Sequence, residues 1–198
     1  MMWATSSGLN TDSTSDKNTF TNTLISKAMI TKDIQEAINK QINAELWSAY
    51  LYLSMAMDAE SKMYRGVANW FFIQCLEEQD HARIFQNFMN DCGARVILAP
   101  IEKVTNEWDS PLEMFQDSLK HEQEVTSMII ELVRLAVKEK DYATLSRLKW
   151  FVDEQVEEEK NARKQVADFS RAGDDFGILT SLDAALSTRK YCTPLPLQ

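Results

Sequence analysis

The chain has 198 residues, 44% of them hydrophobic, which is enough for one domain with a substantial core. Its formal charge of −9 argues against nonspecific binding to nucleic acid or to an anionic membrane, because both need a basic surface, and it suits a protein that handles cations. The three cysteines form no disulfide framework, and the absence of a Cys-x-x-Cys pair excludes a rubredoxin-like iron domain.

Residues 1–30 are rich in Ser, Thr, Asn and Asp and carry no periodic apolar stripe, which predicts a flexible extension. The segment lacks the apolar stretch of a secretory signal, and Asp12 and Asp16, with no Arg, disfavour a transit peptide. We therefore expect a cytoplasmic protein. Residues 31–188 are expected to form the folded domain, and residues 189–198, with two prolines, a loose tail.

The first two helices are expected at about 31–61 and 67–92, the second ending at Gly93. The connection between them is short, so they must be antiparallel neighbours. Residues 93–109 then form the one long connection. At ~3.3 Å per residue it could reach roughly 55 Å, enough to return the chain along a helix of about 40 Å.

The third helix is expected to start after Ser110, with Pro111 at its first position and Glu113 completing a capping box, and to continue to about 139. A break near Asp141 leads into a fourth helix that reaches Ala172. A short fifth helix, about 174–187, has leucines and Ile178 on one face. Two hairpins joined by a long crossover predict an all-α four-helix bundle.

Each long helix carries an apolar seam with steps of four and three, and polar residues interrupt each seam at one level. Because residues three apart share a helix face, His81 joins Glu78 in the second seam. A Glu-x-x-His pair is a weak signal alone, and its place in an apolar seam strengthens it. The interrupting residues, helix by helix, are Glu45; Glu78 with His81; Glu122; and Gln155 with Glu158.

The spacing of these residues repeats. Glu45 and Glu78 are 33 residues apart, as are Glu122 and Gln155, so each antiparallel hairpin should place its pair side by side. Burying an ionised carboxylate without a partner costs several kcal/mol, and neighbouring carboxylates repel one another. No Lys or Arg lies nearby in the seams. Two divalent cations would neutralise four carboxylates, so the pattern predicts a buried di-metal site.

These residues resemble the ferroxidase centre of the ferritins, and the resemblance covers about residues 31–188. The sequence EQVEEE at 154–159, with Trp150 one turn before it, is similar to the fourth helix of bacterial-type non-haem ferritin. The resemblance implies a ferritin-like bundle with a short fifth helix. It implies an iron-storage ferroxidase that oxidises Fe(II) with O2 and deposits ferric mineral inside a homo-oligomeric shell of 24 subunits.

The resemblance also implies roles for single residues. One iron would be bound by Glu45, Glu78 and His81, and a second by Glu122 and Glu158, with Glu78 bridging. Gln155 would donate a hydrogen bond near the dioxygen site. No haem is implied, because Gln79 occupies the position of the haem-ligating Met of bacterioferritin. Carboxylates are hard donors that favour Fe(III) over Fe(II) and so drive the oxidation.

Several interpretations stay open. Glu77, Glu154 and Glu157 each precede a seam residue by one position, and they resemble the third iron site of bacterial ferritins or form a solvated acidic face. Tyr52, seven residues after Glu45, resembles the tyrosine that could give an electron to O2, or it is only packed. The fifth helix either packs at a four-fold axis or closes its own bundle. His121 points off the seam and is expected to be structural.

Other functions fit parts of the pattern. Bacterioferritin is disfavoured because its second hairpin repeats Glu-x-x-His, and a Dps-like protein because its ligands lie between subunits. Another di-iron carboxylate oxidase would share the bundle, although such chains are typically longer. The alternative from a different class is a metal-free or regulatory helical-bundle protein that binds partners through its acidic surface.

Overall fold

The computed structural model describes residues 28–198, so most of the predicted extension lies outside the described residues. Four long helices and one short helix are followed by a single 3-10 turn, and the described part contains no strand, which confirms the all-α bundle. The elements are α2 Lys32–Ser61, α3 Arg65–Asp91, α4 Pro111–Glu139, α5 Tyr142–Ala172, α6 Phe176–Leu186 and η1 Leu195–Leu197.

Local capping explains where the helices begin. The Ile34 amide donates to the Thr31 hydroxyl at the start of α2, and the Glu113 amide donates to Ser110 Oγ at the start of α4. The Glu113 carboxylate accepts from the Asp109 amide, one residue before the usual capping-box partner. Between α4 and α5, Lys140 adopts a left-handed conformation, which ends α4.

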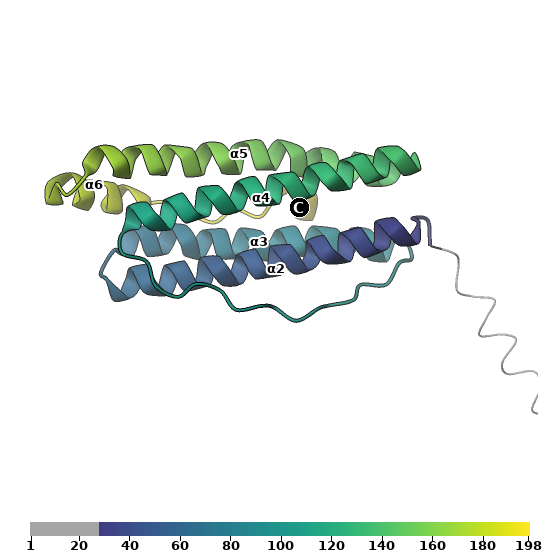
Figure 1. The fold of residues 1–198 in the computed structure, drawn as a ribbon, viewed down its shortest axis with the longest axis horizontal. Coiled ribbons are helices and arrows are strands. Elements are labelled where there is room, and N and C mark those ends of the chain that lie inside the picture. Colours follow the sequence, from purple (N-terminus) through teal and green to yellow (C-terminus); the bar gives the residue numbers. More distant parts are fainter. Residues whose placement is uncertain (1–27) are drawn as a thin grey trace, which may run out of the picture.

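The chain after α3 returns along α2 as the predicted long crossover (Figure 1). Asn39 contacts it near the start of α2, where its side-chain oxygen accepts from the Ile97 amide at 2.7 Å. Ser54 donates to the Thr105 carbonyl at 2.7 Å, and Asp58 accepts from the Trp108 amide at 3.1 Å. The crossover therefore follows nearly the whole of α2 and places the start of α4 at the opposite end of the bundle.

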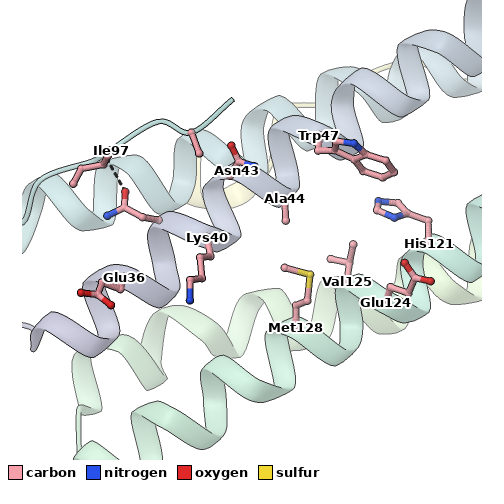
Figure 2. A pocket seen from close by; sticks show the side chains of 12 residues that line it. Glu36, Lys40, Asn43, Ala44, Trp47, Ile97, His121, Glu124, Val125 and Met128 are labelled. Atoms are coloured by element: carbon pink, nitrogen blue, oxygen red, sulfur yellow. Dashed lines mark hydrogen bonds between the residues drawn. The ribbon is translucent and has the colours of Figure 1, made fainter. Parts of the chain in front are cut away.

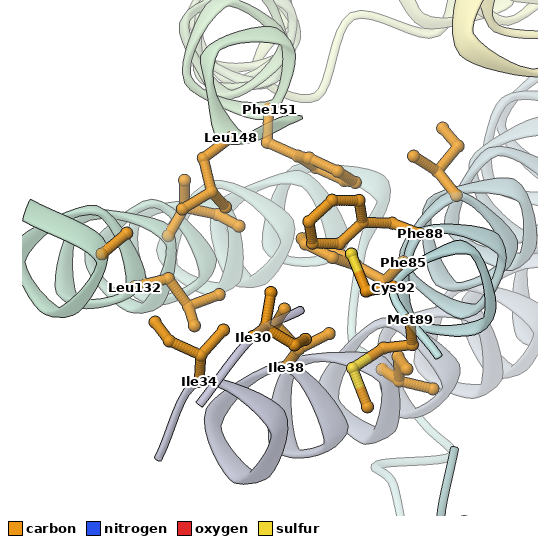
Figure 3. Packing of buried hydrophobic residues seen from close by; sticks show 14 of the residues in the cluster. Ile30, Ile34, Ile38, Phe85, Phe88, Met89, Cys92, Leu132, Leu148 and Phe151 are labelled. Atoms are coloured by element: carbon orange, nitrogen blue, oxygen red, sulfur yellow. The ribbon is translucent and has the colours of Figure 1, made fainter. Parts of the chain in front are cut away.

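Two apolar clusters fill the bundle, one toward each end. The first contains Ile34 and Ile38 of α2, with the rings of Phe85 and Phe151 stacked at 3.9 Å (Figure 3). The second is built around Phe71, Phe115 and Phe169 at the other end. On each long helix the chain passes from one cluster to the other through a short buried polar interval. Those intervals contain the residues that interrupt the predicted seams.

The short helix α6 closes the end of its own bundle. The Val67 amide at the start of α3 donates to the Asp183 carboxylate at 2.9 Å. A Cβ at Gly66 would lie 1.6 Å from the Asp183 carbonyl oxygen, so only glycine permits this approach. Within the chain, α6 therefore closes its own bundle, which is one of the two interpretations that the sequence left open.

The segment after α6 is not the loose tail that its prolines predict. The Asn69 side chain donates to the carbonyls of Leu186 and Arg189, both at 3.1 Å. The Tyr191 hydroxyl donates to Asp80. The prolines remove backbone donors but leave these side chains and carbonyls free to bind α3. Among residues 28–198, none of the helices combines the length and the apolar character that a membrane span requires.

Candidate metal centre

The polar layer between the two apolar clusters is almost fully removed from solvent. Each long helix contributes to it at the position where its seam changes from apolar to polar. No member is more than 5% exposed, and the members are Glu45, Glu78, His81, Glu122, Gln155 and Glu158. The helical packing that excludes water from the two flanking clusters also excludes it from these side chains.

The first hairpin brings three of these residues together. Glu45, Glu78 and His81 each offer a ligand atom, and these atoms all lie within 4.8 Å of one another. His81 Nδ1 is 3.1 Å from Glu78 Oε2. Glu45 Oε2 and His81 Nε2 have no hydrogen-bond partner among residues 28–198. Buried polar atoms are almost always bonded, so these two atoms point to a missing ligand.

The second hairpin places Gln155 beside Glu122, as the 33-residue spacing predicts. Gln155 Nε2 is 3.2 Å from Glu122 Oε2 and donates to it, and it lies 3.3 Å from the Glu122 carbonyl oxygen. The Tyr52 hydroxyl, from α2, donates to the other carboxylate oxygen of Glu122. Tyr52 is itself fully buried against Phe71, so Tyr52 is both packed and bonded to a predicted metal ligand.

In the absence of cations, burial and neighbouring carboxylate charges raise the pKa values of Glu45, Glu78 and Glu122. Burial, followed by the charge of Glu78, raises the pKa of Glu45 to about 8. Burial, followed by the charge of Glu158, raises the pKa of Glu122 to about 8. Burial and the charges of Glu122 and Glu158 also raise the pKa of Glu78. Glu78 is therefore close enough to the second hairpin to be influenced by both of its acids.

In the described part of the chain, no Lys or Arg forms an ion pair with any of these four acids. Carboxylate oxygens and one imidazole nitrogen form a donor set that suits iron. Glu45, Glu78 and His81 therefore fit a divalent cation, on the evidence of the two unpartnered atoms and of the missing positive charge.

The three acids predicted to form a third iron site, Glu77, Glu154 and Glu157, differ in their contacts and exposure. Glu77 forms an ion pair with Arg189 at 2.6 Å, although burial raises its pKa to about 7. Glu154 Oε1 lies 3.9 Å from His81 Nε2, and Glu157 is exposed. Unlike the ligand atoms of Glu45, Glu78 and His81, those of these three acids do not all lie close enough together to hold one metal ion. Their role as a third iron site stays a prediction.

Two glutamines of the site were not predicted from the sequence. Gln41 Nε2 donates to Glu45 Oε1 at 2.9 Å, and Gln74 Nε2 donates to Glu158 Oε2 at 2.9 Å. Both are buried, and each lies four residues before a seam acid on its helix. A glutamine one turn before Glu45 and another before Glu78 were therefore an available signal. They orient the carboxylates, as outer-shell partners commonly do at metal sites.

His121 lies outside the carboxylate layer, and its ring contacts that of Tyr52 edge-on. Its Nε2 is 2.7 Å from the Ser48 hydroxyl, and burial lowers its pKa to about 4, so it is neutral at pH 7. On its outer side is a hollow of about 600 Å³ between α2 and α4, where Figure 2 shows Trp47 and His121 together in the wall. None of the predicted metal ligands lines this hollow.

Comparison with known proteins places this geometry in context. A family model described as a ferritin-like domain matches residues 35–172. The chain is 39% identical over 163 residues to a bacterial non-heme ferritin of Staphylococcus aureus, which covers 82% of this chain and 98% of that protein. A bacterial non-heme ferritin of Staphylococcus saprophyticus is 37% identical over the same shares of both chains.

Solved structures show the same similarity. An open-pore ferritin from the archaeon Archaeoglobus fulgidus superposes with a TM-score of 0.81 at 45% identity, covering 81% of this chain and 99% of that one. A closed form of the same ferritin, engineered by mutagenesis, gives a TM-score of 0.81 at 45% identity and covers 82% of this chain.

Proposed function

Because the chain belongs to the ferritin family, iron storage is its function, and we propose that it is a ferroxidase whose own buried carboxylates bind the Fe(II) that O2 oxidises. Ferritins in general oxidise Fe(II) and store the ferric product. The proposal assigns that chemistry in this chain to the polar layer between the two apolar clusters.

One observation supports this proposal above the others. Four carboxylates, each no more than 5% exposed, lie at one level of the bundle without a Lys or Arg partner among the described residues. An uncompensated buried charge costs several kcal/mol, so the ionised carboxylates are unfavourable here unless cations bind between them. Fe(II) is the substrate cation that the donor set suits.

The residues divide into ligands and supports. Glu45, Glu78 and His81 would bind one Fe(II), and Glu122 and Glu158 the other. The pKa of Glu78 responds to both acids of the second hairpin, which supports a bridging role.

The supporting residues act on Glu122. Gln155 fixes its orientation through the 3.2 Å hydrogen bond. Tyr52, which donates a hydrogen bond to the same carboxylate, would give an electron during oxygen reduction.

The proposal includes a homo-oligomeric shell of 24 subunits with the mineral inside it, as the family implies. It also includes a cytoplasmic location. A third iron bound by Glu77, Glu154 and Glu157 is part of the same proposal.

An iron-loading assay tests the function. Purified iron-free protein is given Fe(II) in air in several additions, and the eluate from size-exclusion chromatography is assayed for protein and iron. We expect iron to elute with a very large particle, in amounts far above two per subunit. A small oligomer that leaves the column without iron would instead favour the metal-free interaction protein.

A further inference from the structure

The segment after α6 is anchored so that one cationic side chain reaches the flank of the metal centre. The side-chain amide of Asn69, on α3, donates hydrogen bonds to the backbone carbonyls on both sides of the turn, those of Leu186 and Arg189. Arg189 Nη1 then donates to the Trp70 carbonyl at 3.2 Å, and its guanidinium lies 4.0 Å from the centre of the Trp70 ring.

This anchored guanidinium binds Glu77. Arg189 Nη2 donates to Glu77 Oε2 at 2.6 Å, and the two side chains are only 19% and 18% exposed. A planar guanidinium that stacks on an aromatic ring and donates in two directions is held in one orientation. The ion pair therefore differs from the exposed pairs elsewhere on the helices, such as Lys149 with Asp153.

We propose that Arg189 sets how strongly this protein binds a third metal ion, because its guanidinium competes with that ion for the carboxylate of Glu77. The inference rests on the proposed function and concerns the acids that flank the proposed iron ligands. Glu154, 3.9 Å from His81, and exposed Glu157 remain able to bind a cation, but without Glu77 they form an incomplete site.

The competition has a direct physical basis. One carboxylate oxygen of Glu77 already accepts a charge-assisted hydrogen bond, and a metal ion must break that bond and move the Arg189 side chain from Trp70. The protein as folded should hence hold two ions tightly and the third weakly. Removing Arg189 frees Glu77 and removes a nearby positive charge, and both changes favour the third ion.

The test is an anaerobic Co²⁺ titration of the assembled iron-free protein, with bound ions counted by equilibrium dialysis. The wild-type protein should bind two ions per subunit tightly and a third weakly. Arg189→Leu should bind the third ion at least about tenfold more tightly, the factor that corresponds to one charge-assisted hydrogen bond. Arg189→Gln serves the same purpose if the leucine variant does not assemble.

Two further variants define the site. Tyr191→Phe removes the tail's hydrogen bond to Asp80 and keeps Arg189, so its third ion should stay as weak as in the wild type. Glu77→Gln in the Arg189→Leu background should remove the gain. If two ions bind tightly and the third binds with equal affinity with and without Arg189, the inference is overturned while the proposed function stands. Absence of the two tight ions in every protein would overturn the proposed function, and this inference with it.

Discussion

Glu45→Ala combined with Glu122→Ala is expected to lower the initial rate of aerobic Fe(II) oxidation by at least ~100-fold, because loss of even an outer-shell partner at a metal site costs ~10–100-fold. Each substitution removes a carboxylate from a different hairpin, so neither proposed iron position keeps its full set of oxygen donors. The rate is measured from the growth of ferric absorbance after Fe(II) is added to equal concentrations of assembled protein.

The matched control is Glu60→Ala combined with Glu131→Ala, which removes the same two charges from the same two helices, α2 and α4. Both side chains are more than half exposed, and each forms an ion pair with a surface Arg. The control should oxidise Fe(II) at about the wild-type rate. An unchanged initial rate in the Glu45 and Glu122 double variant would reject the buried layer as the oxidation site.

The iron-free protein is expected to lose stability as the pH rises from about 5.5 to 8.5. Glu45 and Glu122 have pKa values raised to about 8, from 4.5 in the unfolded chain. Between these two values the folded state binds more protons than the unfolded state, so the free energy of unfolding falls with rising pH and levels off above about 8. The apparent melting temperature should fall by at least ~5 °C, which corresponds to a few kcal/mol.

Divalent cations should remove this pH dependence. With Co²⁺ bound between the acids, the ionised forms are stabilised, so the melting temperature at pH 8 should rise sharply and the slope should nearly vanish. Glu45→Gln with Glu122→Gln, which cannot ionise at these positions, should show a smaller slope without metal. A melting temperature that is constant or rises with pH in the iron-free wild type would contradict the account of the buried acids.

The sequence was sufficient to predict the level of the buried polar layer, because helix periodicity and the 33-residue spacing are local rules that depend only on helix geometry. The position of Gln155 beside Glu122 follows from them. The long crossover was predicted for a similar reason, since the reach of a chain is fixed by its length.

Contacts made by distant, irregular segments could not be predicted in this way. Arg189 meets Glu77 across 112 residues of sequence, and no periodic rule relates a tail residue to a helix face. The two prolines of this segment wrongly suggested a loose tail. Gln41 and Gln74 were missed for another reason, because a glutamine near an acid is common on exposed helix faces. These two glutamines support the carboxylates only because both are buried in the bundle.

The most direct test of the central claim, that cations occupy the space between the four buried carboxylates, is anomalous diffraction from crystals of the assembled protein soaked with Fe(II) under anaerobic conditions. We predict two strong iron peaks in each subunit. One should lie among Glu45, Glu78 and His81, and the other between Glu122 and Glu158. Crystals that hold iron elsewhere but show no peak in this layer would contradict the account.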